Sequence, residues 1–150
     1  MKRFFLAAAL LAAVASASAF AAQSYRLTKY DNPALASACY AIVGPYNNHF
    51  DAAVVVGSWG ICGYSDRTQR IGPGSVLHDA AIFHNVSGTW KFVEKGNGYW
   101  SAVGLEQASV PANIAPSLAT AFRTDICARG GVPATHWFCS RQGKAMVTGS

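Results

Sequence analysis

The chain has 150 residues, of which 51% are hydrophobic, and its formal net charge is +5. This length suits a single domain that buries a sizeable core. The basic residues are dispersed and form no run of five or six like charges. Because dispersed charge is a poor electrostatic footprint for DNA or RNA, a nucleic-acid partner is not expected.

The N-terminus predicts an export signal of bacterial type over residues 1–21. Basic residues open the chain, and an apolar run from Phe4 to Val14 follows. Ala19-Phe20-Ala21 fits the A-x-A cleavage rule, and Ala17-Ser18-Ala19 is a second candidate. A membrane span needs about 20 apolar residues, so this run is short for an anchor. Residues 22–150 are therefore expected to form one globular domain without a membrane span, located in the periplasm or secreted.

Four cysteines lie in the expected mature chain, namely Cys39, Cys62, Cys127 and Cys139. An even number in an exported protein predicts two disulfides, and three pairings are possible. We favour Cys39–Cys62 and Cys127–Cys139, because each closes a short loop at modest entropic cost. His136 and Cys139 also have an H-x-x-C spacing, but a metal site would need reduced thiols and further ligands. No metal and no cofactor are therefore expected.

The first predicted elements in chain order are a strand and a helix. Tyr25 to Tyr30 could form a short strand. Asn32-Pro33 is typical of a helix cap followed by proline at the first helical position. The helix is expected over Ala34 to Ala41, before Gly44-Pro45 ends it. Three residues at spacings of four and three share its buried face: Leu35, Cys39 and Ile42.

An antiparallel meander is predicted next. The apolar, β-branched run from Ala52 to Cys62 indicates one central strand that is buried on both faces. Tyr64 to Gly74 has the composition of a loop. Ser87-Gly88 is a two-residue hairpin connection between the strands that flank it. The remaining strands are expected at Ser75–Val86, Thr89–Glu94 and Tyr99–Val103.

The C-terminal part predicts one long helix and a short clip. Apolar residues recur every four positions between Pro111 and Arg129, with Asn113 as the expected cap. Pro133 to Cys139 is expected to be a short helix or an extended clip, and the tail from Ser140 onward to be frayed. The fold class is therefore α+β: an antiparallel sheet of about four strands, packed by a short N-terminal helix and a C-terminal helix, with two disulfides.

The sequence contains no common catalytic signature. G-x-S-x-G, H-E-x-x-H, a phosphate-binding glycine loop and an EF-hand loop are all absent, so no catalytic residue is assigned. His78 and His84 are six apart on one predicted strand, which places them about 20 Å apart and prevents direct pairing. An alternative function is a small secreted hydrolase, a nuclease that uses imidazoles as acid and base. Its candidate residues are His49, His84 and His136, with Lys91, Arg67 or Arg70 on the phosphate.

Four tryptophans are more than the core of so small a domain requires. Surface Trp and Tyr are typical anchors of interfaces, whereas buried ones fill the core. Trp59, which is flanked by glycines, and Tyr99-Trp100, beside a glycine-rich turn, are the candidate binding residues. The leading hypothesis is a non-catalytic binding protein, such as an inhibitor or immunity-type protein of the bacterial envelope. Its partner would be another exported protein or an envelope polymer.

Overall fold

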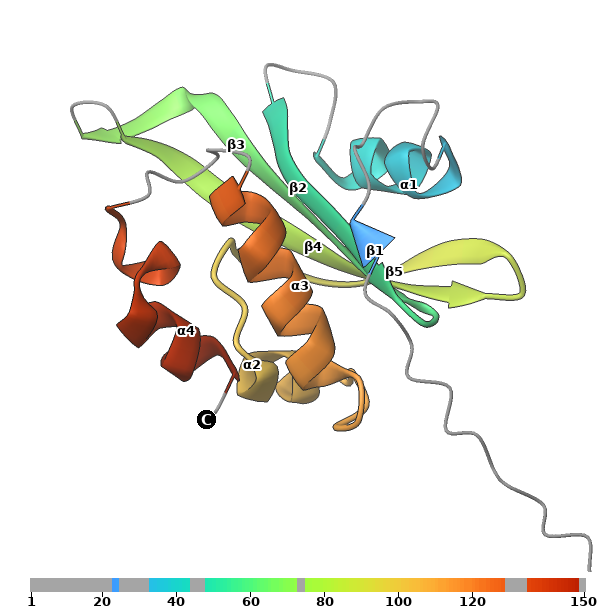
Figure 1. Cartoon of the computed structure of the whole chain (residues 1–150). Coiled ribbons are helices and arrows are strands. Elements are labelled where there is room, and N and C mark those ends of the chain that lie inside the picture. The colour runs from blue at the N-terminus through green and yellow to red at the C-terminus, as the bar shows by residue number, and fades with distance from the viewer. Residues whose placement is uncertain (1–22, 25–32, 44–47, 73–74, 129–134, 149–150) are drawn as a thin grey trace, which may run out of the picture.

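The computed structural model describes residues 23–24, 33–43, 48–72, 75–128 and 135–148, with an antiparallel sheet at its centre and helices on both faces (Figure 1). The strands follow chain order across the sheet: β1 (Gln23–Ser24), β2 (Asn48–Val56), β3 (Trp59–Gly72), β4 (Ser75–Val86) and β5 (Thr89–Asn97). The helices are α1 (Pro33–Val43), α2 (Ala102–Gln107), α3 (Ala115–Ala128), the short 3-10 helix η1 (Trp137–Cys139) and α4 (Arg141–Thr148). This confirms the α+β prediction, with a four-strand meander to which β1 adds a two-residue edge.

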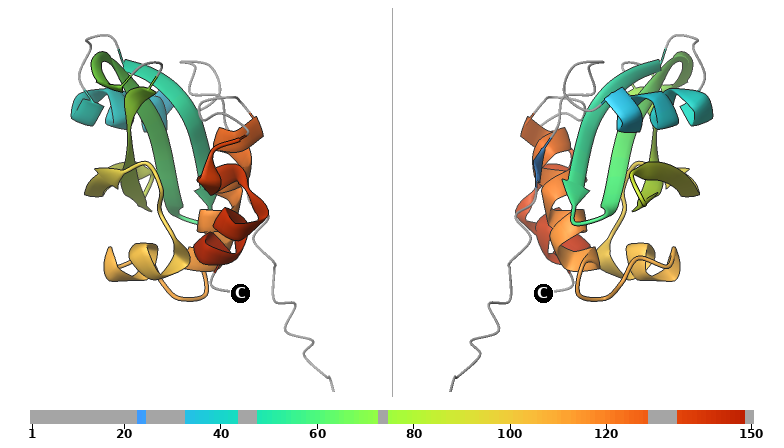
Figure 2. Two further views of the ribbon diagram at one scale, coloured as in Figure 1. Left: turned by 90° about the vertical axis from the view of Figure 1, so that its left-hand side faces the viewer. Right: turned by 90° about the vertical axis from the view of Figure 1, so that its right-hand side faces the viewer.

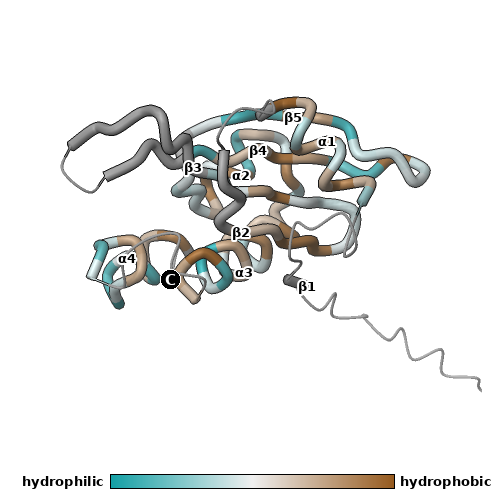
Figure 3. The backbone as a smooth tube through the Cα atoms, turned by 90° about the horizontal axis from the view of Figure 1, so that it is seen from above, coloured by the Kyte–Doolittle hydropathy of each residue, from teal (hydrophilic) through white to brown (hydrophobic). Residues whose placement is uncertain are grey.

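The sheet separates two hydrophobic layers because its side chains alternate between faces. Ile61 and Ile82, which pair across β3 and β4, belong to the main core under α3. Their neighbours Cys62 and Phe83 belong to the second core under α1. Figure 3 shows α1 on one side of the sheet and α3 with α4 on the other, and Figure 2 gives the two side views.

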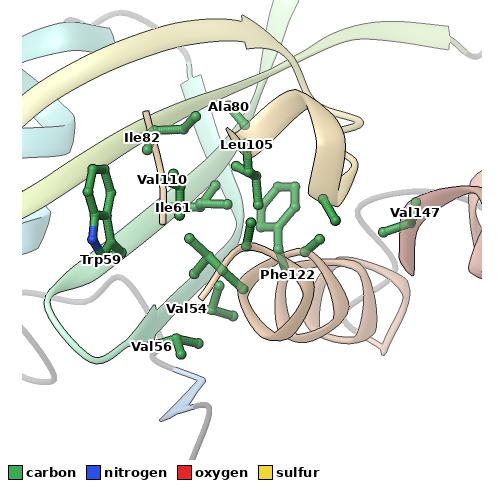
Figure 4. Close-up of a cluster of buried hydrophobic side chains, with 14 of the residues drawn as sticks. Val54, Val56, Trp59, Ile61, Ala80, Ile82, Leu105, Val110, Phe122 and Val147 are labelled. Atoms are coloured by element: carbon green, nitrogen blue, oxygen red, sulfur yellow. The ribbon is translucent and has the colours of Figure 1, made fainter. Parts of the chain in front are cut away.

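Helix α3 supplies the helical side of the main core. Residues at the predicted spacing of four, Leu118, Phe122 and Ile126, are fully buried. Phe122 packs directly beneath Gly63 of β3, where a Cβ would lie 2.9 Å from its ring. Figure 4 shows Phe122 among side chains from β2, β3, β4 and α2. The periodicity of the sequence therefore identified the face of this helix that is buried.

Helix α1 closes the opposite face of the sheet as predicted. Pro33 is its first residue, and Leu35 and Cys39 are completely buried. Cys39 is bonded to Cys62 of β3, and the second bridge joins Cys127 to Cys139. Both expected disulfide pairings are thus confirmed.

The apolar run Ala52–Cys62 is a hairpin rather than the single strand predicted. Val56 pairs with Trp59, and Gly57 between them has a φ of 59°, which a glycine adopts without steric cost. The run stays apolar across the turn because both strands are central in the sheet. The predicted loop Tyr64–Gly74 was also wrong, since β3 continues to Gly72 and pairs with β4 through two register shifts. The polar composition of this segment did not indicate a strand, but its backbone can still pair with β4, because sheet hydrogen bonds do not require apolar side chains.

Three further predictions in the C-terminal part were wrong. The segment Tyr99–Val103 is no strand, because the Ser101 hydroxyl accepts the Gly104 N–H at 3.1 Å and starts α2. Helix α3 begins only at Ala115, after a turn, so Asn113 is not the residue immediately before it. The tail is not frayed, because α4 forms there and buries Val147 in the main core.

Several predictions fall outside the described residues. These are the export signal with its cleavage position, the strand Tyr25–Tyr30 and the Gly44-Pro45 helix end. The clip predicted over Pro133–Cys139 is described from residue 135 onward, where it contains η1. Among the helices that the structure describes, none is both long and apolar enough to cross a membrane.

Candidate binding surface

Trp59, the first predicted binding residue, lies in the main core. Only 8% of it is exposed, and its ring stacks on His84 of β4 with centroids 4.4 Å apart and planes 10° from parallel. Figure 4 shows it at the edge of the core beside Ile61 and Ile82. The face of β3 that carries Trp59 is the one covered by the C-terminal helices, so this ring offers almost no area to a partner.

Trp100, the second, is held between two glycines. A Cβ on Gly96 would lie 2.9 Å from its Cζ2 atom, and one on Gly104 would lie 3.3 Å from its Cε3 atom. The half-buried indole packs against the main core, and its buried Nε1 has no hydrogen-bond partner in the described part of the chain. Gly96, which belongs to the glycine-rich turn noted in the sequence, and Gly104 therefore make room for the ring, which joins the end of β5 to α2.

Tyr99, the third, belongs to an aromatic cluster that the sequence separates by almost 40 positions. We use "aromatic cluster" for Tyr99, His136, Trp137 and Phe138. The Tyr99 ring stacks on His136 at 5.2 Å and packs at 5.6 Å and 4.9 Å from Trp137 and Phe138. Phe138 is completely buried, whereas Trp137 is 47% exposed. In the aromatic cluster, the Phe138 ring is thus buried and the Trp137 ring faces solvent.

Helix α3 fixes the backbone of η1 from one side. The Arg123 guanidinium donates through Nε to the Phe138 carbonyl at 2.6 Å and through Nη2 to the Ser140 carbonyl at 2.7 Å. It also lies 6.0 Å from the centroid of the Phe138 ring. One turn further along α3, Cys127 holds Cys139 covalently. Two separate attachments therefore join η1 to the helix that makes the core.

Side-chain caps hold both ends of η1. At its start, His136 Nδ1 accepts the Phe138 N–H at 3.3 Å, while Nε2 lies 3.5 Å from the Tyr99 hydroxyl. At its end, the Ser140 hydroxyl donates to the Trp137 carbonyl at 2.5 Å and accepts the Gly143 N–H at 3.1 Å. Trp137 is therefore an exposed ring on a backbone that is fixed at both ends.

The groups proposed for histidine catalysis have other contacts. His84 stacks on Trp59 and His136 stacks on Tyr99, while the side chain of His49 lies outside the described residues. Within the described part of the chain, no three His, Cys, Asp or Glu residues are grouped so that they could hold a metal ion. The nuclease hypothesis and its residues stay a prediction.

Among the described residues, Asp125 is a buried acid, and only 7% of its surface is exposed. One of its carboxylate oxygens accepts the Ala53 N–H at 3.1 Å. Ala53 lies next to the irregularity in β2, where the register shifts between Phe50 and Ala52. The Asp125 carboxylate thus joins α3 to the backbone of β2 and gives a buried N–H its acceptor.

Comparison with protein-family models, with curated proteins and with solved structures finds no match for this chain. The functional inference therefore depends on the geometry of the aromatic cluster. The sequence analysis did not predict Trp137 as a binding residue, nor the hydrogen bonds from Arg123 that hold its turn. A signal was nevertheless present: His136, Trp137 and Phe138 are consecutive rings just before a bonded cysteine. Of these three rings, Phe138 is completely buried and Trp137 is exposed.

Proposed function

We propose that this chain is an exported, non-catalytic binding protein that anchors a protein partner on Trp137, in the manner of an inhibitor or immunity-type protein of the bacterial envelope. The observation that carries the proposal is a tryptophan, 47% exposed, on a turn held by a disulfide, an arginine and two caps. Tryptophan and tyrosine are enriched among the residues that dominate binding energy at protein interfaces. Tyr99, one of the three binding residues predicted from the sequence, packs against the exposed Trp137 ring.

Rigidity favours binding over a merely structural role for this turn. Ordering a flexible side chain on association costs about 0.5–1.5 kcal/mol, and ordering a loop costs more. Here the backbone around Trp137 is already ordered in the free protein, so this cost falls on folding and not on binding. Such preorganisation is what a recognition element requires.

Charge beside the cluster favours an acidic partner surface. Helix α4 follows η1 directly and exposes Arg141 and Lys144, which are three positions apart and therefore neighbours on the helix surface. Residues 137–148 contain no Asp or Glu. An aromatic anchor with a basic rim is complementary to an acidic patch, and such complementarity mainly raises the association rate and the specificity.

Export is supported by the predicted signal and by both disulfides, since disulfides persist in oxidising compartments. An envelope or extracellular partner is the class of protein that such a chain would meet.

The test is a binding comparison with matched variants. Oxidised protein would be used as bait in envelope and culture-fluid extracts, and affinity for the captured partner would then be measured with both components purified. We expect Trp137→Ala to weaken binding at least about 30-fold, the effect of losing an interface hot spot. Phe92→Ala is the control, because Phe92 has a similar exposure of 45% and lies on the face of the sheet that α1 covers. Equal binding by wild type and Trp137→Ala would overturn the proposal.

A further inference from the structure

We infer that two copies of this chain associate through β5, which joins their sheets edge to edge about a two-fold axis. The inference does not rest on the proposed function, because it concerns a different part of the molecule. In the described sheet, β5 is last in the strand order and pairs with β4 alone. Its outer edge therefore carries backbone N–H and C=O groups with which a further strand can pair.

A bulge in β5 determines which charged side chains of this edge share a face. Lys91 is opposite His84 and Glu94 is opposite Ile82, because the register shifts between Ile82 and Phe83. His84 and Ile82 are two positions apart on β4, so they point to the same face. Residues directly opposite each other in a ladder share a face as well. Lys91 and Glu94 therefore lie on one face of the sheet, although a spacing of three places residues on opposite faces of a regular strand.

That shared face permits a symmetric pairing of two β5 strands. If the strands run antiparallel about an axis between Phe92 and Val93, Lys91 of each copy is opposite Glu94 of the other copy. A two-fold axis perpendicular to the sheet keeps each side chain on its own face, so opposed residues must share a face. Lys91 and Glu94 meet this condition because of the bulge, and both are exposed in the single chain. The dimer thus gains two identical pairs of opposite charge.

The charges also select this register and this partner. Lysines and bulges usually protect an edge strand from pairing with other chains. With the axis at Lys91 or at Glu94, like charges are opposite each other, which is destabilising. An unrelated acidic strand neutralises Lys91 but places an acid beside Glu94. A second copy supplies an acid to Lys91 and a base to Glu94, so it is the occupant that fits this edge.

Phe92 adds apolar area next to the axis. Its side chain is 45% exposed, and its ring packs against Phe83 with centroids 6.1 Å apart. Phe83 belongs to the core under α1, so Phe92 lies on that side of the sheet. In the dimer the two Phe92 rings are neighbours across the axis and cover each other. Exposed ion pairs contribute little on their own, so this burial supplies affinity while the charges fix the register.

Dimerisation through β5 leaves the aromatic cluster accessible. Figure 1 shows the β4–β5 hairpin and α4, which follows η1 directly, on opposite sides of the molecule. The dimer therefore presents two Trp137 rings. A partner surface with two binding sites within reach of both rings is then held more tightly than by one copy.

The test is sedimentation equilibrium of the oxidised protein from about 10 µM to about 1 mM, a range that covers weak edge contacts. We expect a reversible dimer whose Kd rises with salt concentration, because exposed charge pairs are screened. Glu94→Lys and Lys91→Glu should each raise this Kd at least about tenfold, since both symmetric pairs then become repulsive. The double variant Lys91→Glu/Glu94→Lys restores two pairs of opposite charge and should dimerise within about threefold of wild type. Phe92→Ala should raise the Kd at least about fivefold through the lost apolar burial.

An equimolar mixture of the two single variants is the control for folding. One variant carries two bases at the edge and the other carries two acids, so only the mixed dimer pairs opposite charges, and it should form about as tightly as the wild-type dimer. A misfolded variant would not be rescued in this way.

Three outcomes overturn the inference directly: a wild-type protein that stays monomeric at about 1 mM, single variants that dimerise like wild type, or a mixture without mixed dimers. Trp137→Ala should dimerise like wild type. Loss of the dimer in that variant would place self-association at the aromatic cluster and would overturn the inference as well. The proposed function is judged separately, by the affinity of Trp137→Ala for the partner.

Discussion

Gly143 of α4 provides the sharpest test of how the Trp137 turn is supported. A Cβ at this position would overlap the Trp137 carbonyl oxygen and would lie 2.6 Å from the Phe138 carbonyl oxygen. Both are backbone atoms of η1, and the Phe138 carbonyl is also bonded to Arg123. Gly143→Ala therefore cannot be accommodated by rotation of a side chain.

Two effects of this substitution have opposite signs. Alanine is favoured over glycine within a helix by about 1 kcal/mol, which would stabilise α4. Against this, ordinary contacts begin near 3.4 Å, so α4 must move at least about 0.8 Å away from Phe138. That movement uncovers part of Val147, whose full burial contributes about 1.5–3 kcal/mol, and stretches the bond from Gly143 to Ser140. We expect a net loss of about 1–3 kcal/mol in the free energy of unfolding.

The assay is urea unfolding of the oxidised protein, followed by tryptophan fluorescence. Because α4 could detach locally, tryptic cleavage after Arg141 and Lys144 would be measured alongside it. Gly104→Ala in α2 is the control: its Cβ would lie 3.3 Å from a Trp100 ring atom and 3.4 Å from the Ser101 hydroxyl. Both distances are close to ordinary van der Waals contact, so a shift of a few tenths of an ångström suffices and the stability should change by less than about 1 kcal/mol. A Gly143→Ala protein at least as stable as wild type, with unchanged cleavage, would refute the reasoning.

Other predictions concern the cores. Asp125→Leu should lower the free energy of unfolding by about 1–3 kcal/mol in urea titrations, because the Ala53 N–H loses its acceptor, and Asp125→Asn should recover part of it. Burial, aided by nearby Asp79, raises the pKa of Tyr64 to about 12. Folding therefore favours the neutral phenol. The free energy of unfolding should not depend on this group below about pH 10, and it should fall by on the order of 2 kcal/mol as the pH rises to 12. Urea titrations of Tyr64→Phe should lack this component of the alkaline loss. Gly96→Ala should destabilise by about 1–3 kcal/mol through its clash with Trp100, and less in a Trp100→Leu background, as a double-mutant cycle would measure.

Local signals in the sequence located most elements correctly. The four-residue spacing on α3 predicts its buried face, because a helix repeats its orientation at nearly that interval. The pairing Cys127–Cys139 follows from loop length, and Ser87-Gly88 marks the β4–β5 turn, where both residues have a positive φ. Each of these depends on residues that are close together in the chain.

The errors came from features that depend on distant partners. Composition could not place the Gly57 turn inside an apolar run, because strands on both sides of the turn are buried by helices from elsewhere. Trp59 and Trp137 are the same residue type, yet one is 8% exposed and the other 47%. The difference depends on which face of the sheet the C-terminal helices cover, and single-residue properties do not contain that information.

The bracing of Trp137 follows from how α3 divides its residues. Phe122 and Ile126 are four apart and face the sheet, whereas Arg123 and Cys127 are one position further on and hold η1. Two adjacent stripes of one helix thus perform two tasks, one that makes the core and one that orients an exposed ring. Because both stripes belong to one rigid element, the core fixes where the ring is presented. A structural role for η1 would account for the buried Phe138, whereas the proposed binding role would use the exposed Trp137.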